Sequence, residues 1–248
     1  MLADYREIMP VRWPVPLDWE NFQRRNLKGI IAPKDHFRIK LAFELMDMAH
    51  DGQFRETGEP YKAHPIRVVE RLRIAGFEDP AIFVVGLLHD VNEDAKERMR
   101  IWLIETLPRV RPELANIRNR STTDMYEKLF GVKAFRDIKA LSKVEPIDDN
   151  YESKQFAEIK TLDNVARGSP VVWLVKLSDR LDNVVTLPLH PDDPARLEKD
   201  LDRIRRKLIE TRRDYWPIFE DAVAWYPMAK TLLVALDRRC NRLARTAG

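Results

Sequence analysis

Cysteine is nearly absent from this chain of 248 residues, which contains only Cys240. A single cysteine excludes a disulfide within the chain, and it also excludes the paired cysteines of zinc ribbons and thiol redox motifs. Because no histidine stands near Cys240 in the sequence, we expect an inert thiol rather than a nucleophile. The pattern fits a reducing, cytoplasmic setting.

Apolar runs are also too short to cross a membrane. The longest, AIFVVGLL and PVVWLV, fall far below the roughly 18 to 20 residues that a spanning helix needs. The first residues, MLADYREIMPVRW, carry charges early and lack the apolar centre of a secretory signal. We therefore predict a soluble, cytoplasmic protein with no membrane partner.

Neither sign of charge dominates, since 43 Lys and Arg stand against 40 Asp and Glu and the formal net charge is +3. So narrow a surplus is weak support for nucleic-acid binding. Acidic residues flank the basic run RIRRKLIETRR, which is therefore typical of a solvated helix face with ion pairs four residues apart. We expect no nucleic-acid partner.

The chain has no glycine-rich phosphate loop, no series of alternating strands and no internal repeat. Its apolar residues recur at helical spacing instead, as in the stripe Phe37, Leu41, Leu45 and Met48, which predicts a core-facing helix. The predicted class is all-α.

Two segments are apolar on most faces and are predicted to be central helices. Asp79 with Pro80, and Ser169 with Pro170, are typical of a helix cap followed by a first-turn proline.

The sequence predicts one domain over residues 35–248, with helical periodicity resuming at residues 125–144. Residues 1–34 hold four prolines and two tryptophans, which indicate an extended arm strapped onto the domain. Residues 96–125 are charged and contain two prolines, so one or two short helices in a surface insertion are expected there.

The first central segment ends in GLLHDVNEDA, where His89, Asp90, Glu93 and Asp94 follow an apolar wall. On a helix these residues form two adjacent columns at spacings of four. Burying the carboxylates costs several kcal/mol unless they are paired, protonated or bound to a cation. A solvated helix end with salt-bridge partners is the alternative.

The second central segment, in KLSDRLDNV, carries Asp179 and, four residues later, Asn183. His64 stands at a predicted helix start. Together with His89 and Asp90, these residues offer two imidazoles and two carboxylates, a set suited to a divalent transition metal such as Mn²⁺, Fe²⁺ or Co²⁺ with open positions for water and substrate.

These motifs resemble the HD-domain metal-dependent phosphohydrolases. The segments AHDGQFRETGEPYKAHPIRV, GLLHDVNEDA, LFG, LSK and LVKLSDRLDNV, spread from about Lys34 to about Ala224, resemble the hydrolase domain of the RelA/SpoT homologues. The resemblance implies an all-α HD-domain helical bundle that removes the 3′-pyrophosphate of (p)ppGpp, giving GDP or GTP and pyrophosphate.

The resemblance also assigns roles position by position. It places the ligands of one divalent ion, Mn²⁺ being favoured, on His64, His89, Asp90 and Asp179. It places catalytic roles on Glu93, Asp94 and Asn183. It places contacts to a small-molecule nucleotide on Arg55 and Asn183; Arg180, beside a proposed ligand, is expected equally to contact phosphate or to pair with an acid.

Three positions depart from the family's usual residues: Asp182, Asn92 and Glu56 stand where a histidine, an aliphatic residue and a basic residue are common. Glu56 removes an expected phosphate contact. An adenosine alarmone or another nucleotide such as NADPH therefore stays open as the substrate. A non-catalytic nucleotide sensor is a separate alternative. A homo-oligomer and a cognate alarmone synthetase as functional partner are both compatible with this interpretation.

Overall fold

The computed structural model describes residues 17–91, 95–114, 121–142, 159–160 and 169–247. Within these ranges the secondary structure is helical, and the sole β pairing is an isolated bridge between Phe54 and Pro60. The all-α prediction is confirmed. None of the described helices is long and apolar enough to cross a membrane.

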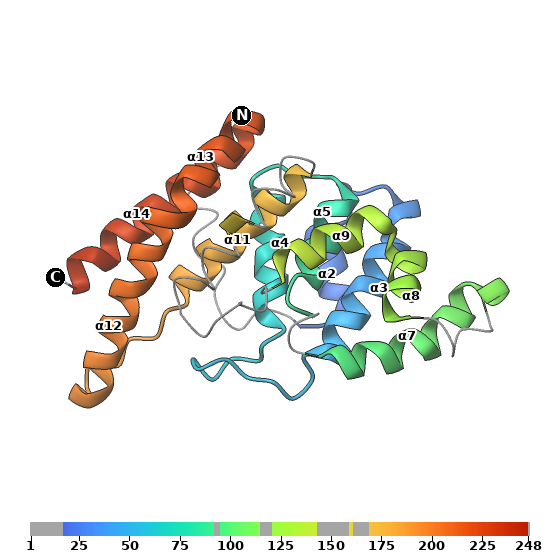
Figure 1. Ribbon diagram of the computed structural model, residues 1–248, viewed down its shortest axis with the longest axis horizontal. Helices are drawn as coiled ribbons and strands as arrows, with labels where there is room; N and C mark the ends of the chain where they lie inside the picture. The colour runs from blue at the N-terminus through green and yellow to red at the C-terminus, as the bar shows by residue number, and fades with distance from the viewer. Residues whose placement is uncertain (1–16, 92–94, 115–120, 143–158, 161–168, 248) are drawn as a thin grey trace.

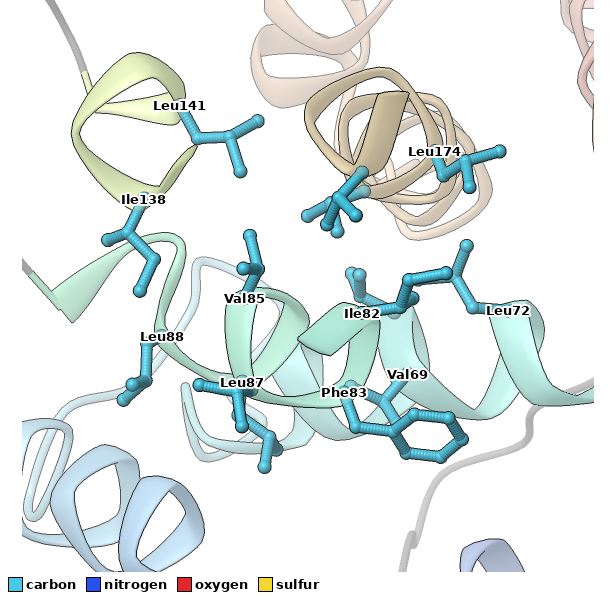
Figure 2. Packing of buried hydrophobic residues seen from close by; sticks show 14 of the residues in the cluster. Val69, Leu72, Ile82, Phe83, Val85, Leu87, Leu88, Ile138, Leu141 and Leu174 are labelled. Carbon is cyan, nitrogen blue, oxygen red and sulfur yellow. The ribbon is translucent and has the colours of Figure 1, made fainter. Parts of the chain in front are cut away.

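Helix α5 (Pro80–Leu88) lies at the centre of the molecule, between α3 (Pro33–Ala49), α4 (Ala63–Ile74), α9 (Val132–Leu141) and α11 (Pro170–Val185). Figure 2 shows the packing: Val85 of α5 points toward the side on which Ile138 and Leu141 of α9 lie, Leu88 points the other way, and Ile82 lies near Leu72 of α4. The residues of α5 from Ile82 to Leu88 are all buried, as the sequence predicts for a central helix.

Gly86 explains how closely α4 and α5 approach each other. A Cβ atom at Gly86 would lie 2.9 Å from Val69 Cγ2, inside the contact distance of two carbon atoms. Because Gly86 has no side chain, the Val69 side chain of α4 packs directly against the backbone of α5, just before α5 ends at Leu88.

Helices α12 (Pro194–Glu210), α13 (Trp216–Trp225) and α14 (Lys230–Ala247) form a layer on one side of α11 (Figure 1). A π-helical turn, Thr211–Tyr215, joins α12 to α13. The inward face of α12 includes Ile204, which is buried, and Leu201 and Leu208, which are partly buried.

The expected extended arm is wrong for the part of it that the structure describes. Residues Trp19–Asn26 form helix α2, capped by the Asp18 side chain, which accepts from the Asn21 amide at 2.9 Å. Trp19 does fasten this segment to the domain, because its ring lies 5.6 Å from the ring of Phe43 on α3. Residues 1–16, with Trp13, lie outside the described residues.

The expected short helices of residues 96–125 are likewise replaced by one longer helix, α7 (Lys96–Val110), despite Pro108 inside it. Met99, Leu103 and Leu107 are buried, so α7 adds to the core instead of standing apart from it. A short 3₁₀ turn, Pro112–Leu114, follows. Whether this segment is an insertion relative to the family stays a prediction, as does the single-domain division.

Three further details differ from expectation. The helix predicted over residues 125–144 is broken by Gly131 (φ +93°) into α8 (Thr122–Phe130) and α9. Phe37 is exposed, although Leu41 and Leu45 of the same stripe are buried. Asp79 caps α5 as predicted, whereas the Ser169 hydroxyl donates to Asp137 Oδ2 at 2.6 Å and does not cap α11.

Candidate metal centre

Three packed helices bring the four predicted metal ligands together. His64 lies in the first turn of α4, His89 and Asp90 lie in the turn that follows α5, and Asp179 lies in the middle of α11. Because α5 ends at Leu88, the aspartate and histidine project from its terminus toward α4 and α11. The pair from α5 thus follows directly on a helix whose residues from Ile82 to Leu88 are all buried.

The donor atoms of these residues lie at the spacing that a metal ion imposes. His64 Nε2 is 3.2 Å from His89 Nε2, 3.4 Å from Asp90 Oδ2 and 3.2 Å from Asp179 Oδ1. His89 Nε2 is 3.3 Å from Asp90 Oδ2 and 3.9 Å from Asp179 Oδ1. Ligands about 2.1 Å from one ion stand roughly 3.0 to 3.5 Å apart, so a single cation fits among the donor atoms of His64, His89 and Asp90. Asp179 Oδ1 lies next to this group, on the side of His64.

The hydrogen bonds of the two histidines leave both Nε2 lone pairs aimed at this point. His89 Nδ1 donates to the Gly86 carbonyl at 2.8 Å, and His64 Nδ1 donates to Asp182 Oδ2 at 2.6 Å. A neutral imidazole that donates from Nδ1 presents a lone pair at Nε2. Two lone pairs 3.2 Å apart repel unless a proton or a metal ion lies between them, so the donor set fits a divalent metal.

The electrostatics also favour a cation here. Burial and the Arg55 charge lower the pKa of His64, but hydrogen bonds to Asp179, Asp182 and Asp90 outweigh them and raise it to about 10. Without a metal ion His64 therefore carries a proton at Nε2, and a bound ion would take the place of that proton. Burial raises the pKa of Asp90, yet the neighbouring His89 and His64 hold it well below its usual range. The carboxylates therefore stay ionised, and the cluster requires positive charge.

Asp179 is kept ionised in a similar way. Burial alone would raise the pKa of Asp179. The Lys176 charge and the hydrogen bond with His64 have a larger, opposite effect, so this pKa lies below its usual value. Lys176 Nζ lies 3.4 Å from Asp179 Oδ2, while Asp179 Oδ1 accepts from Asn183 Nδ2 at 2.6 Å. Asn183 thus orients the carboxylate without adding charge to an acidic cluster.

A cavity of about 300 Å³ adjoins the cluster. Tyr61 connects the two, since it lines the cavity and its hydroxyl donates to Asp90 Oδ2 at 2.9 Å. Asn183 lines the cavity as well, and its Oδ1 accepts from Arg55 Nη2 at 2.8 Å. The cavity is lined by Phe54, Arg55, Glu56, Thr57, Tyr61, Asn183, Thr186, Leu187, Pro188, Arg203 and Lys207.

Other predicted site residues are placed less directly. Arg180 donates to Glu210 Oε2 at 2.8 Å, and its guanidinium lies 3.9 Å from the centre of the Tyr215 ring. These contacts fit the ion-pair alternative, and a role in substrate binding stays a prediction. Glu93 and Asp94 lie outside the described residues, so their catalytic roles stay predictions too.

Sequence reasoning missed several residues that contact the cluster. Tyr61 and Arg67 were not singled out, and Asp182 was noted only as a departure from the family pattern. Arg67 and Asp182 are 115 residues apart in the chain, and their guanidinium and carboxylate meet at 2.7 Å. A signal did exist, because an acidic residue three positions after Asp179 on an apolar helix needs a buried partner.

No family model matches the chain. The Aquifex aeolicus protein named guanosine-3′,5′-bis(diphosphate) 3′-pyrophosphohydrolase is 30% identical over 155 residues, which cover 62% of this chain and 18% of that protein. The protein of the same name from Borreliella burgdorferi is 31% identical over 192 residues, covering 75% and 24%. The bifunctional (p)ppGpp synthase/hydrolase SpoT of Escherichia coli is 28% identical over 170 residues, covering 68% and 21%.

These matches span about a fifth of the length of each relative and most of this chain. They run through a chain whose fold is all-α and whose central helices carry the histidine and aspartate cluster. The chain is therefore a homologue of the hydrolase domain of the SpoT/RelA family.

Proposed function

We propose that this chain is a metal-dependent hydrolase that removes the 3′-pyrophosphate of a guanosine or adenosine alarmone. The observation that carries the proposal is the arrangement of His64 and His89, whose Nε2 lone pairs meet at 3.2 Å between two carboxylates. The name of the SpoT relative covers both synthesis and hydrolysis. A metal cluster of this composition supports hydrolysis, because it can activate water.

The reaction would break the bond between the ribose 3′-oxygen and the adjacent phosphorus. Water supplies the oxygen that joins the pyrophosphate, and the ribose oxygen takes up a proton to leave GDP, GTP or the adenosine analogue. His64, His89, Asp90 and Asp179 would hold one divalent ion, with Mn²⁺ as our choice. When bound, such an ion supplies Lewis acidity that polarises phosphate and acidifies water.

The protein's own groups would position the nucleotide and move the proton. Asn183 holds Asp179 in place, and Arg55 offers a planar fork to phosphate or a flat face to a base. We assign acceptance of the water proton to Glu93 and Asp94, which follow the HD pair in the chain. Arg180 is proposed as a further contact to phosphate.

The charge of the cavity supports an anionic ligand. Arg55, Arg203 and Lys207 line it, so three cationic side chains face a space that adjoins the metal cluster. Glu56 carries the opposing charge, and its carboxylate forms an ion pair with Arg203. Lys207 Nζ lies 2.9 Å from Glu210 Oε2, so Arg203 and Lys207 would each have to leave an acidic partner to contact a phosphate.

Product analysis tests the proposal. The purified protein is incubated with Mn²⁺ and, in parallel, with ppGpp, ppApp and NADPH, and the inorganic product is identified. Pyrophosphate together with GDP or ADP is the expected result, and both chelation of the ion and the Asp90→Ala variant should abolish it.

Other products identify the alternatives. Orthophosphate released from NADPH alone would replace our proposal with a phosphatase acting on another nucleotide. Binding of nucleotide with no turnover in Mn²⁺ would replace it with a nucleotide sensor. A cognate synthetase, a homo-oligomer and a cytoplasmic location are further predictions that this assay leaves to genetic, hydrodynamic and fractionation measurements.

A further inference from the structure

Asp182 is a buried carboxylate on which three arginines and one histidine converge. Its exposed fraction is 0%, and it lies one helical turn after the metal-cluster residue Asp179 on α11. Its Oδ2 atom accepts from His64 Nδ1 at 2.6 Å and from Arg55 Nη1 at 3.0 Å. The remaining contacts come from two arginines of α4, at positions 67 and 71.

The two α4 arginines hold the carboxylate in one orientation. Arg67 donates through Nε to Oδ1 at 2.7 Å and through Nη2 to Oδ2 at 3.0 Å, which is a bidentate pair. Arg71 donates to Oδ1 through Nη1, while its Nε and Nη2 have no hydrogen-bond partner within the described part of the chain. Asp182 is thus the one carboxylate that Arg71 reaches there.

Satisfying Arg67 alone would not require Asp182. Glu59 already binds the same guanidinium through two hydrogen bonds, at 2.7 and 2.6 Å. Arg71 does require Asp182 as its counter-charge, because an unpaired buried charge is strongly destabilising. Charge pairing with Arg67 and Arg71 does not, however, require this carboxylate to bind His64 as well. Only Asp182, and not Glu59, also accepts the Nδ1 proton of a metal-cluster histidine.

We propose that Asp182 is a positioning residue for His64, fixed in place by Arg67 and Arg71, and that it determines the affinity of the metal centre. Its carboxylate holds His64 in the tautomer that presents Nε2 to the ion, and its negative charge makes that imidazole a stronger ligand. Partners of this kind typically contribute a factor of 10 to 100 in metal affinity. The inference rests on the metal centre of the proposed function.

The test measures Mn²⁺ affinity by calorimetric titration of the metal-free protein, with the absorption spectrum of bound Co²⁺ as a second readout. The Asp182→Asn variant keeps the shape of the side chain and removes its charge. We expect Mn²⁺ to bind about 10 to 100 times more weakly and the Co²⁺ spectrum to change. Glu59→Gln is the matched control, because it removes a buried carboxylate from Arg67 without touching His64.

Glu59→Gln should destabilise the fold yet leave Mn²⁺ affinity within about threefold and the Co²⁺ spectrum unchanged, since the ligand itself is untouched. Equal loss of affinity in the two variants, or no loss in Asp182→Asn, would overturn the proposal. If the wild-type protein binds no Mn²⁺ or Co²⁺, the metal centre itself fails and this inference fails with it. Wild-type binding that Asp182→Asn leaves unchanged overturns the inference alone.

A second pair of variants covers the case in which Asp182→Asn does not fold. Asp182→Asn combined with Arg71→Met removes one charge of each sign and keeps the buried charge balanced. It is compared with Arg71→Met alone. Mn²⁺ binding at least tenfold weaker in the double variant supports the role of Asp182, and equal affinity contradicts it.

Discussion

At the scale of single residues, the role of each histidine in the cluster depends on what its other ring nitrogen binds. His64 and His89 each use Nδ1 to donate, one to a carboxylate and one to a backbone carbonyl. Their Nε2 atoms are left for a ligand. Glu93 and Asp94 have a different task in our proposal, because we assign them proton transfer and not metal binding.

Because Asp90 is proposed to bind the metal and Glu93 to transfer a proton, we expect their replacement to have different effects on metal binding and turnover. Asp90→Ala should lose Mn²⁺ binding and turnover together, since it removes a ligand. Glu93→Gln should keep Mn²⁺ affinity and lower kcat by about 10²- to 10⁴-fold, the usual contribution of a positioned acid or base. Titration calorimetry and steady-state kinetics on the same preparations check this. Full activity in Glu93→Gln would remove it from the mechanism.

Cys240 is a residue whose pH response follows from burial. Its side chain is buried in α14, and burial is the main cause that raises its pKa from 9.0 to about 11. Below pH 9 the thiol is neutral in both folded and unfolded protein. Between pH 9 and 11 the unfolded thiol ionises first, so the folded state loses stability as the pH rises.

We therefore predict that wild-type protein loses about 1 to 2 kcal/mol more stability than Cys240→Ala between pH 8 and pH 10.5. Lysine and tyrosine titrations occur in both proteins and cancel in the comparison. Denaturant unfolding at the two pH values measures the difference. Parallel stability curves for the two proteins would show that the thiol ionises at its ordinary pKa in the fold.

At the scale of helices, the α4–α5 contact determines where His89 lies. Gly86 allows that contact, and its carbonyl also accepts the His89 Nδ1 proton. A residue of ordinary size at this position would press α5 away from α4 and move the histidine at its end.

Gly86→Ala should therefore destabilise the protein by about 1 to 3 kcal/mol, the usual cost of overpacking, and weaken Mn²⁺ binding. The colliding atom is Val69 Cγ2, so Gly86→Ala combined with Val69→Ala should be less destabilised than the sum of the two single variants. Thermal unfolding of the four proteins measures this coupling. Strict additivity would mean that the helices adjust without cost.

Some helices could be predicted from the sequence and others could not. The two central helices were predicted correctly because a nearly continuous apolar run with a capping residue and a first-turn proline has few other solutions. Helix α2 was not, since the two tryptophans and four prolines of residues 1–34 suggested an extended strap. The break at Gly131 depends on a left-handed backbone that helical periodicity alone does not reveal.

The candidate site divides in the same way. His64, His89, Asp90 and Asp179 could be proposed from type and spacing, and the fold brings their donor atoms together. The carboxylate of Asp182 could not be paired in advance, because its partners come from α4 and from the loop near residue 55. Contacts over more than 100 residues follow from packing, which a single sequence does not display.

At the scale of the whole molecule, the metal centre joins three helices that would separate on unfolding. His64, the HD pair and Asp179 come from α4, the end of α5 and α11, so an ion held by all of them binds the folded state only. Such binding stabilises the fold by mass action.

Mn²⁺ at 100 times its dissociation constant should add about 2.7 kcal/mol of stability, or roughly 5 to 10 °C in Tm for a chain of this size. Thermal unfolding in Mn²⁺ and in a chelator measures the shift. Asp90→Ala should show none. An equal shift in both proteins would place the stabilising ion elsewhere.

The carboxylate oxygen that His64 and Arg55 share has a consequence for how two ligands influence each other. Arg55 lines the cavity, and His64 faces the ion. If a phosphate draws Arg55 toward itself, Asp182 Oδ2 has one cation fewer to share and its bond to His64 strengthens. Nucleotide and metal would then bind with positive cooperativity, and by thermodynamic reciprocity each would tighten the other by the same factor.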